Sequence, residues 1–179
     1  YQKGWEGLPE GESSGNIEGC PVVAPDGTLY NIMRYDMTKL TPNHGIVMMY
    51  RVDTEHPEAP LKYEKPSYLP GNHSKFEIKF DEVSGKYYTI ISRIRGTESA
   101  HQRNLLSLMS STDLVNWTLV CDLIDRRDED PMHTGFQYVD FIFEGEDILF
   151  RCRTAVNNAS NFHDTNYQTF HRVKNFRSL

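Results

Sequence analysis

Short apolar runs separated by tight-turn signals recur along the chain, and three stretches share one pattern. Each has a run rich in Val, Ile, Tyr and Phe, a turn that contains glycine, and a second such run, which is typical of a β-hairpin. The stretches are residues 22–34 with the turn Asp26-Gly27, residues 76–93 with the turn Ser84-Gly85, and residues 138–153 with a turn at Gly145. Long helical periodicity is absent, so the pattern predicts an all-β protein.

Each predicted hairpin is followed by further strand-like residues, in 45–53, 105–120 and 167–176. A hairpin and a second, outer pair of strands make four strands per repeat. The hairpins end in Arg34, Arg93 and Arg153, which lie 93 − 34 = 59 and 153 − 93 = 60 residues apart. Four strands recurring at this spacing favour the blades of a β-propeller over a sandwich. A closed domain of another all-β type is the alternative.

We therefore expect one domain over residues 1–179, with three four-stranded antiparallel blades at 17–65, 74–125 and 135–179. Propellers close with roughly four to eight blades, so three blades are part of a ring. We expect a ring of six blades, or alternatively of five. The remaining blades would then lie in further sequence or in a partner chain.

Composition narrows the class of protein. The chain has 179 residues, of which 38% are hydrophobic and 25% charged, as in soluble globular domains. No apolar run reaches the roughly 18 residues that a membrane span needs. The net charge of −6 gives no indication of a nucleic-acid partner. Three scattered cysteines, Cys20, Cys121 and Cys152, do not form a disulfide framework and are expected to be buried thiols.

Arginines are the first candidates for chemistry. The first strand of every propeller blade lines the central channel, so residues at matching positions of successive blades converge. A guanidinium offers a planar fork of donors that grips a carboxylate with two hydrogen bonds. Arg34, Arg93, Arg103 and Arg153 are therefore candidates to bind one anionic ligand. The alternative for any one of them is an ion pair with a surface acid.

Three segments resemble, in the same order, segments of the sialidase superfamily of β-propeller glycoside hydrolases with Asp-box turns. Residues 15–34 resemble the segment in which a glutamate precedes a Val-rich strand, an Asp-Gly turn and a strand ending in arginine. Residues 101–117 resemble the stretch where another arginine enters a Leu-rich strand and an Asp-box-like turn ending in Trp. Residues 133–150 resemble the stretch with Tyr-x-Asp, an apolar strand and a glycine turn.

The resemblance implies a retaining, sialidase-like exo-glycoside hydrolase with an acidic sugar as substrate, in a secreted or periplasmic protein. It implies Tyr138 as the nucleophile, Glu18 as its activating base, and Arg34 and Arg103 as ligands of the sugar carboxylate. A phenol of pKa about 10 needs a nearby base to take its proton. A neutral phenol also avoids repulsion by that carboxylate. The family's first arginine and its acid/base aspartate have no counterpart in these residues.

Two alternative functions use other residues. Asp140 and Glu18 could be the carboxylate pair of a five-bladed propeller glycosidase, a class in which the phrase at residues 113–117 also occurs. A propeller that binds acidic glycans without hydrolysis would keep the arginines and need no activated tyrosine.

Further candidates have no place in the family pattern. Arg93, Arg153 and His133 are retained as substrate-binding candidates on their position and chemistry. No spacing of His, Cys, Asp or Glu matches a zinc or calcium template, so we expect no metal and no other cofactor.

Overall fold

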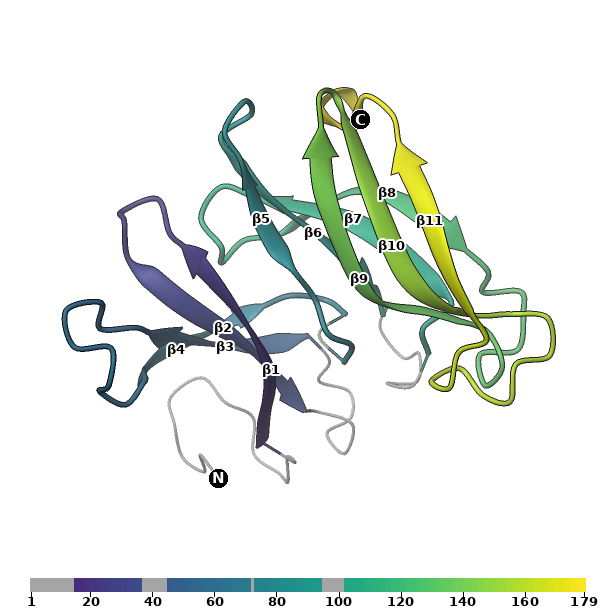
Figure 1. Cartoon of the computed structure of the whole chain (residues 1–179), viewed down its shortest axis with the longest axis horizontal. Coiled ribbons are helices and arrows are strands. Elements are labelled where there is room, and N and C mark those ends of the chain that lie inside the picture. The colour runs from purple at the N-terminus through teal and green to yellow at the C-terminus, as the bar shows by residue number, and fades with distance from the viewer. Residues whose placement is uncertain (1–14, 37–44, 72, 95–101) are drawn as a thin grey trace.

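Three antiparallel sheets make up the part of the chain that the structure describes (Figure 1). The computed structural model describes residues 15–36, 45–71, 73–94 and 102–179. The first sheet contains β1 (Gly15–Val23), β2 (Leu29–Asp36), β3 (Ile46–Arg51) and β4 (Lys62–Tyr68). The second contains β5 (Ile78–Asp81), β6 (Lys86–Ser92), β7 (Leu105–Ser111) and β8 (Thr118–Asp125). The third contains β9 (Gly135–Glu144), β10 (Asp147–Ala155) and β11 (Tyr167–Val173), and a 3-10 helix, η1 (Phe176–Ser178), follows.

Within each sheet the strands lie in chain order, each antiparallel to the next. The innermost strands are β1, β5 and β9 (Figure 1). Between sheets, β1 contacts β5, and β9 contacts β6 and β7. This is the arrangement of propeller blades, which confirms the prediction of an all-β, partial propeller. Among the described residues, no helix is long and apolar enough to cross a membrane.

The third sheet has three strands where the sequence predicts four. Residues 167–176 give the single strand β11 rather than a pair. Asn175 adopts a left-handed backbone conformation (φ 51°), and the chain turns there into η1. A short asparagine tolerates this conformation better than most residues, so it ends the extended run.

The core depends on the two-residue period of the second sheet. On β6, Tyr87 and Ile91 pack against the first sheet, whereas Tyr88 and Ile90 pack against the third. Successive strand side chains point to opposite faces, so β6 is buried on both sides. β7 continues the pattern, with Met109 on the first side and Leu106 and Leu108 on the second.

The three cysteines are free thiols. Cys20 and Cys152 are buried and Cys121 is partly buried. Burial raises the pKa of the Cys20 thiol to about 11. This side chain therefore acts as a small apolar residue of the core between the first and second sheets.

The turn between β7 and β8 is held by its own polar side chains. Asp113 accepts hydrogen bonds from the backbone N–H groups of Val115 (2.9 Å) and Asn116 (2.7 Å). Although burial raises the pKa of Asp113, these bonds outweigh it and lower the pKa to about 2. Trp117 packs against the apolar core between the first and second sheets, and its Nε1 donates to the carbonyl of Leu114 (3.3 Å).

The end of the chain joins the turns of two sheets. Phe176 is buried, with its ring 5.0 Å from Tyr88 and 5.3 Å from Phe143. Arg177 donates from Nε (2.8 Å) and Nη2 (2.6 Å) to the buried carboxylate of Asp81. Ser84 donates to the same carboxylate, and the bonds from Arg177 are the main reason that the pKa of Asp81 lies well below its usual range.

We expect Asp81→Ala to lower the free energy of unfolding by about 3 kcal/mol, because it leaves the Arg177 guanidinium without its buried partner. Glu146→Ala is the matched control: Glu146 pairs with the same arginine at 3.4 Å, but its side chain is 71% exposed, so the loss should stay below about 1 kcal/mol. Denaturant unfolding of both variants measures the difference.

The pH dependence has a defined sign. Because folding lowers the pKa of Asp81, its contribution is complete above the unfolded value of about 3.9 and is lost as the pH falls below it. The stability gap between the wild type and Asp81→Ala should therefore narrow in acid. An equal gap at pH 7 and pH 3 would contradict this assignment.

Candidate functional site

Two inner strands contain a β-bulge at matching places. On β1, Glu18 is an extra residue between Ile17 and Gly19, which pair with consecutive residues of β2. On β9, Tyr138 lies at a register shift opposite β10. Both residues have left-handed backbone conformations, with φ of 51° and 53°, which are costly for residues other than glycine. A bulge re-aims a side chain, and such strain is common at functional sites.

An arginine lies opposite the residue that precedes each bulged residue. Arg34 pairs with Ile17, just before Glu18, and Arg153 pairs with Gln137, just before Tyr138. The first and third sheets thus repeat one local design, in which an arginine on the second strand lies beside the bulged residue.

Glu18 and Arg34 form an ion pair. Arg34 donates from Nη1 to Oε2 of Glu18 at 2.9 Å, with side chains 8% and 25% exposed. The buried Nε of Arg34 has no hydrogen-bond partner among the described residues. The pair is therefore held in place and still reaches solvent through the glutamate.

Arg103 lies between the two bulges. It precedes β7, and its backbone bridges to Gly135 at the start of β9. Its Nη2 donates to the carbonyl of His73 at 3.0 Å, and its Nη1 donates to Oε1 of Gln137. The guanidinium carbon also lies 5.3 Å from the centre of the Phe162 ring. These contacts fix the guanidinium while its Nε lacks a partner among the residues described.

The electrostatics of Arg103 show which groups surround it. Burial is the main cause, and the charges of Arg34 and Arg153 add to it, so that the pKa of Arg103 is lowered to about 10. Tyr138 and Glu18 act in the opposite direction. Arg103 remains charged at neutral pH, and the three guanidinium groups face two carboxylates, Glu18 and, beside Arg153, Asp164, which leaves a surplus of 3 − 2 = 1 positive charge. An anionic ligand would offset this surplus.

Tyr138 is half-buried beside Arg153. The guanidinium carbon of Arg153 lies 5.0 Å from the centre of the Tyr138 ring, and the His163 ring meets that ring edge-on at 6.2 Å. Arg153 also donates from Nη2 to the carbonyl of His163 at 2.7 Å. The phenol is therefore packed on its ring and not sealed in hydrocarbon.

Gln137 connects these parts. The signal for it in the sequence is weak, because it is a single polar residue in an apolar strand. Its side chain is fully buried. Its Oε1 accepts from Arg103, and its Nε2 donates to the carbonyls of Phe162 (2.9 Å) and His163 (3.0 Å). A side chain at Gly135 would lie 2.9 Å from the Phe162 carbonyl, so glycine permits this close approach.

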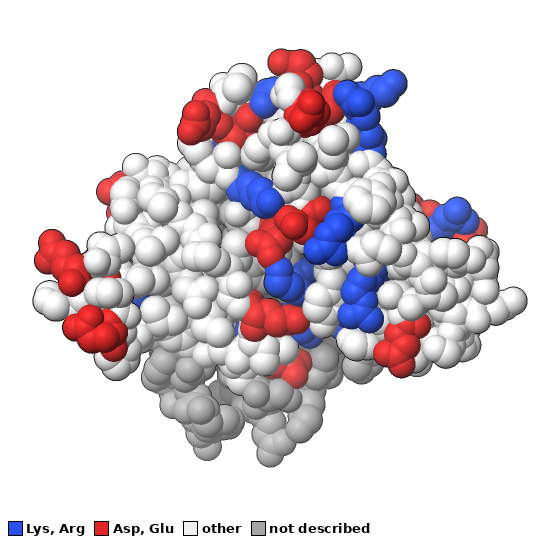
Figure 2. All heavy atoms as spheres, in the orientation of Figure 1, with Lys and Arg blue, Asp and Glu red and all other residues white. Residues whose placement is uncertain are grey.

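The structure thus brings five of the eight predicted site residues together: Glu18, Arg34, Arg103, Tyr138 and Arg153. They come from β1, β2, the segment before β7, β9 and β10. Near the middle of the face that Figure 2 shows, basic and acidic side chains lie side by side.

Three predicted residues lie elsewhere. Arg93 donates to Ser107 (3.0 Å) and Asp122 (2.6 Å) on the outer strands, so its fork is already occupied.

Asp140 pairs with Lys79 at 2.9 Å, which lowers the pKa of Asp140, and His133 contacts Asp130 at 2.7 Å on an exposed loop.

Within the described ranges, no group of three or more His, Cys, Asp or Glu could hold a metal ion.

Comparison by sequence gives no relative: no protein-family model and no curated protein matches the chain. Comparison by structure gives an α-L-arabinanase from Penicillium chrysogenum in complex with arabinobiose (TM-score 0.58, 11% identity, 90% of this chain and 46% of that one). An α-L-arabinofuranosidase from Fusarium graminearum in complex with an iminosugar inhibitor is equally similar (0.58, 12%, 90% and 46%). A GH43 β-1,3-galactosidase also matches (0.51, 13%, 90% and 31%).

The chain has the fold of part of a propeller. It spans less than half the length of each of these proteins. At such low identity the likeness shows the fold alone. The three are named as an arabinanase, an arabinofuranosidase and a galactosidase, and none of them is named as a sialidase.

We expect Gln137→Leu to lower the free energy of unfolding by about 2–4 kcal/mol, because Nη1 of the buried Arg103 loses its acceptor and the Phe162 carbonyl loses the donor Gln137. The His163 carbonyl keeps its hydrogen bond from Arg153. Gln168→Leu is the control on the exposed surface of β11, with an expected change within about 0.5 kcal/mol. Equal denaturation midpoints for the two variants would show that the Gln137 network contributes nothing.

Proposed function

We propose that this chain contributes to the active site of a glycoside hydrolase that acts on an acidic sugar and retains its configuration. The observation that carries the proposal is the cluster of three guanidinium groups, Arg34, Arg103 and Arg153, around a bulged tyrosine and glutamate. Such a surplus of fixed donors suits a carboxylate, because guanidinium forks bind carboxylates by charge and geometry together.

The proposed reaction uses Tyr138 and Glu18. Arg34 holds Oε2 of Glu18, which leaves Oε1 to accept the phenolic proton of Tyr138. The tyrosine oxygen then bonds to the anomeric carbon while the bond to the leaving oxygen breaks, and that oxygen takes a proton from an acid that these residues do not supply.

Water completes the cycle. It attacks the anomeric carbon, the carbon–tyrosine bond breaks, and Glu18 returns its proton to the phenolate oxygen. The proton that water loses passes to the group that earlier protonated the leaving oxygen. Two displacements at one carbon retain its configuration, and sialidases are known to use a tyrosine in this way.

The fold comparisons support the glycosidase part of the proposal. The similar solved structures are named for enzymes that act on galactosides and arabinosides, which are neutral sugars. The charge of the arginine cluster favours an acidic sugar instead. An enzyme for such glycans would be secreted or periplasmic, and that localisation is part of the proposal.

A two-carboxylate mechanism is the second candidate, since Asp140 lies two residues from Tyr138 on the inner strand β9 and its side chain is 48% exposed. In that mechanism Glu18 and Asp140 would flank a neutral sugar. A propeller that binds acidic glycans without cleaving them is the third candidate. It would bind the glycan and release no product.

In the full-length protein, we expect Tyr138→Phe to reduce turnover of an aryl sialoside by at least about 1,000-fold, because the phenolic oxygen is the proposed nucleophile. Tyr167→Phe, on an exposed tyrosine of β11, should retain the wild-type rate. Release of a neutral sugar by both variants at the wild-type rate would overturn the proposed mechanism and favour the two-carboxylate candidate.

We expect Arg153→Met to weaken binding of free sialic acid by about 10-fold or more, since one charged fork beside the proposed carboxylate site is lost. Binding of galactose should not change. Arg126→Met, at an exposed arginine paired with Glu129, controls for the loss of charge alone. Calorimetric titration of the three proteins measures the effect, and equal affinities would exclude Arg153 from carboxylate recognition.

A further inference from the structure

One face of the third sheet is apolar and open. Alternate residues of β9–β11 point to the second sheet, as Phe141 and Phe150 do, while their neighbours point the other way. On that second face Phe170 is 79% and Ile142 is 54% exposed. Figure 1 shows the covered face toward β6–β8 and the open face toward the viewer.

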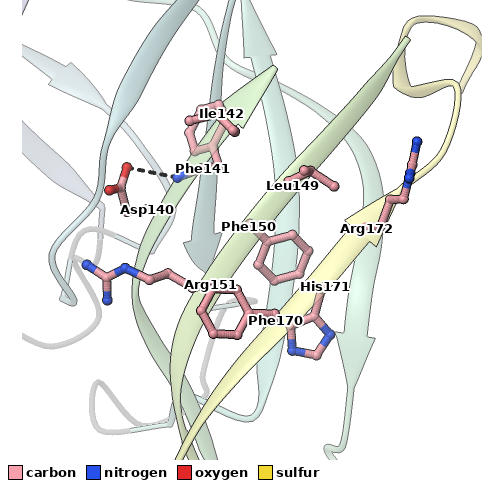
Figure 3. Close-up of a pocket in the computed structure, with 9 residues that line it drawn as sticks. All are labelled: Asp140, Phe141, Ile142, Leu149, Phe150, Arg151, Phe170, His171 and Arg172. Carbon is pink, nitrogen blue, oxygen red and sulfur yellow. Dashed lines mark hydrogen bonds between the residues drawn. The ribbon is translucent and has the colours of Figure 1, made fainter. Parts of the chain in front are cut away.

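The exposed residues form one continuous surface. Leu149 pairs with Ile142 across the ladder, and Arg151 pairs with Phe170. Together they line a groove of about 530 Å³, flanked by Asp140 and Arg172 (Figure 3). Apolar groups in a row across three strands, with charges at the rim, have the composition of a surface that another element covers.

The covered faces of this chain show what kind of element that is. The second sheet is covered on both faces, each time by another antiparallel sheet that packs through alternate apolar residues. Ile142, Leu149 and Phe170 present the same two-residue alternation as the residues of those two interfaces. The similar solved propellers are also more than twice as long as the matched region.

We propose that the open face of β9–β11 is the contact surface for a further antiparallel sheet of the same protein, the next blade of the propeller. The contacts would be apolar at Ile142, Leu149 and Phe170. Arg172 lies at the rim of the groove, where it is already paired with Asp147 at 2.5 Å (Figure 3). This inference does not depend on the acidic-sugar proposal, because its apolar contacts are made by Ile142, Leu149 and Phe170, none of which belongs to the cluster around Arg103.

Thiol labelling in the full-length native protein tests the proposal directly. Phe170→Cys and Val83→Cys replace two apolar residues with nearly equal exposure in this structure, 79% and 76%. Val83 lies in the turn between β5 and β6, away from any sheet face. We expect the cysteine at 170 to react at least about 100-fold more slowly than the cysteine at 83, because only opening of the blade contact would expose it.

Two results would overturn the proposal. Similar labelling rates at both positions would show that the face is open to solvent. Protection at 170 that disappears on dilution would show that a second copy of the chain covers it.

The wild type gives the background from its native thiols, and Ile142→Cys repeats the measurement with a smaller change. If neither cysteine variant on this face folds while Val83→Cys does, the face is buried, because substitutions at exposed positions rarely prevent folding.

Discussion

The burial of the second sheet on both faces is the constraint on which the arrangement depends. Tyr87 and Ile91 of β6 contact one neighbour, and Tyr88 and Ile90 contact the other. A one-residue slip of β6 would exchange these sets, so the register is strongly specified. Because the second sheet is fixed between the other two, inner-strand residues of the first and third sheets can meet at Arg103.

The arginine cluster is costly to assemble, and the structure shows how that cost is met. Arg34 and Arg103 are both buried and of like charge. Glu18 neutralises the first, whereas the second receives only uncharged partners: a carbonyl of His73, the amide of Gln137 and the face of an aromatic ring. Neutral acceptors satisfy hydrogen bonds and leave the positive charge uncompensated, which keeps it available to an incoming anion.

The sequence predicts the strand order and most of the sheets because hairpin turns and two-residue periodicity are local signals. It predicts less of the site. Arg93 has nearly the same spacing from its turn as Arg34, but the β5–β6 pair has no bulge, and Asp122 on the outer strand offers a closer partner. The acidic residue that pairs with an arginine on a neighbouring strand depends on strand pairing between residues distant in the sequence. The spacing of residues along one strand does not contain that information.

The role of Gln137 does not follow from the sequence for the same reason. Its importance comes from Arg103, 34 residues earlier, and from two carbonyls about 25 residues later. An isolated polar residue between Phe136 and Tyr138 on a buried strand is a weak local signal. Its partners become visible only when the fold brings the three segments together.

The repeated bulge explains how one local design can supply two different chemical groups. Glu18 and Tyr138 occupy equivalent places, each with an arginine opposite the preceding residue. Arg34 forms an ion pair with the Glu18 carboxylate, whereas the Arg153 guanidinium packs on the face of the Tyr138 ring. An arginine at this place can therefore stabilise either group. The residue at the bulge can therefore differ between sheets while the backbone that aims it stays the same. A base and a nucleophile delivered from equivalent places in two sheets would reach the same level of the channel, as a proton transfer between them requires.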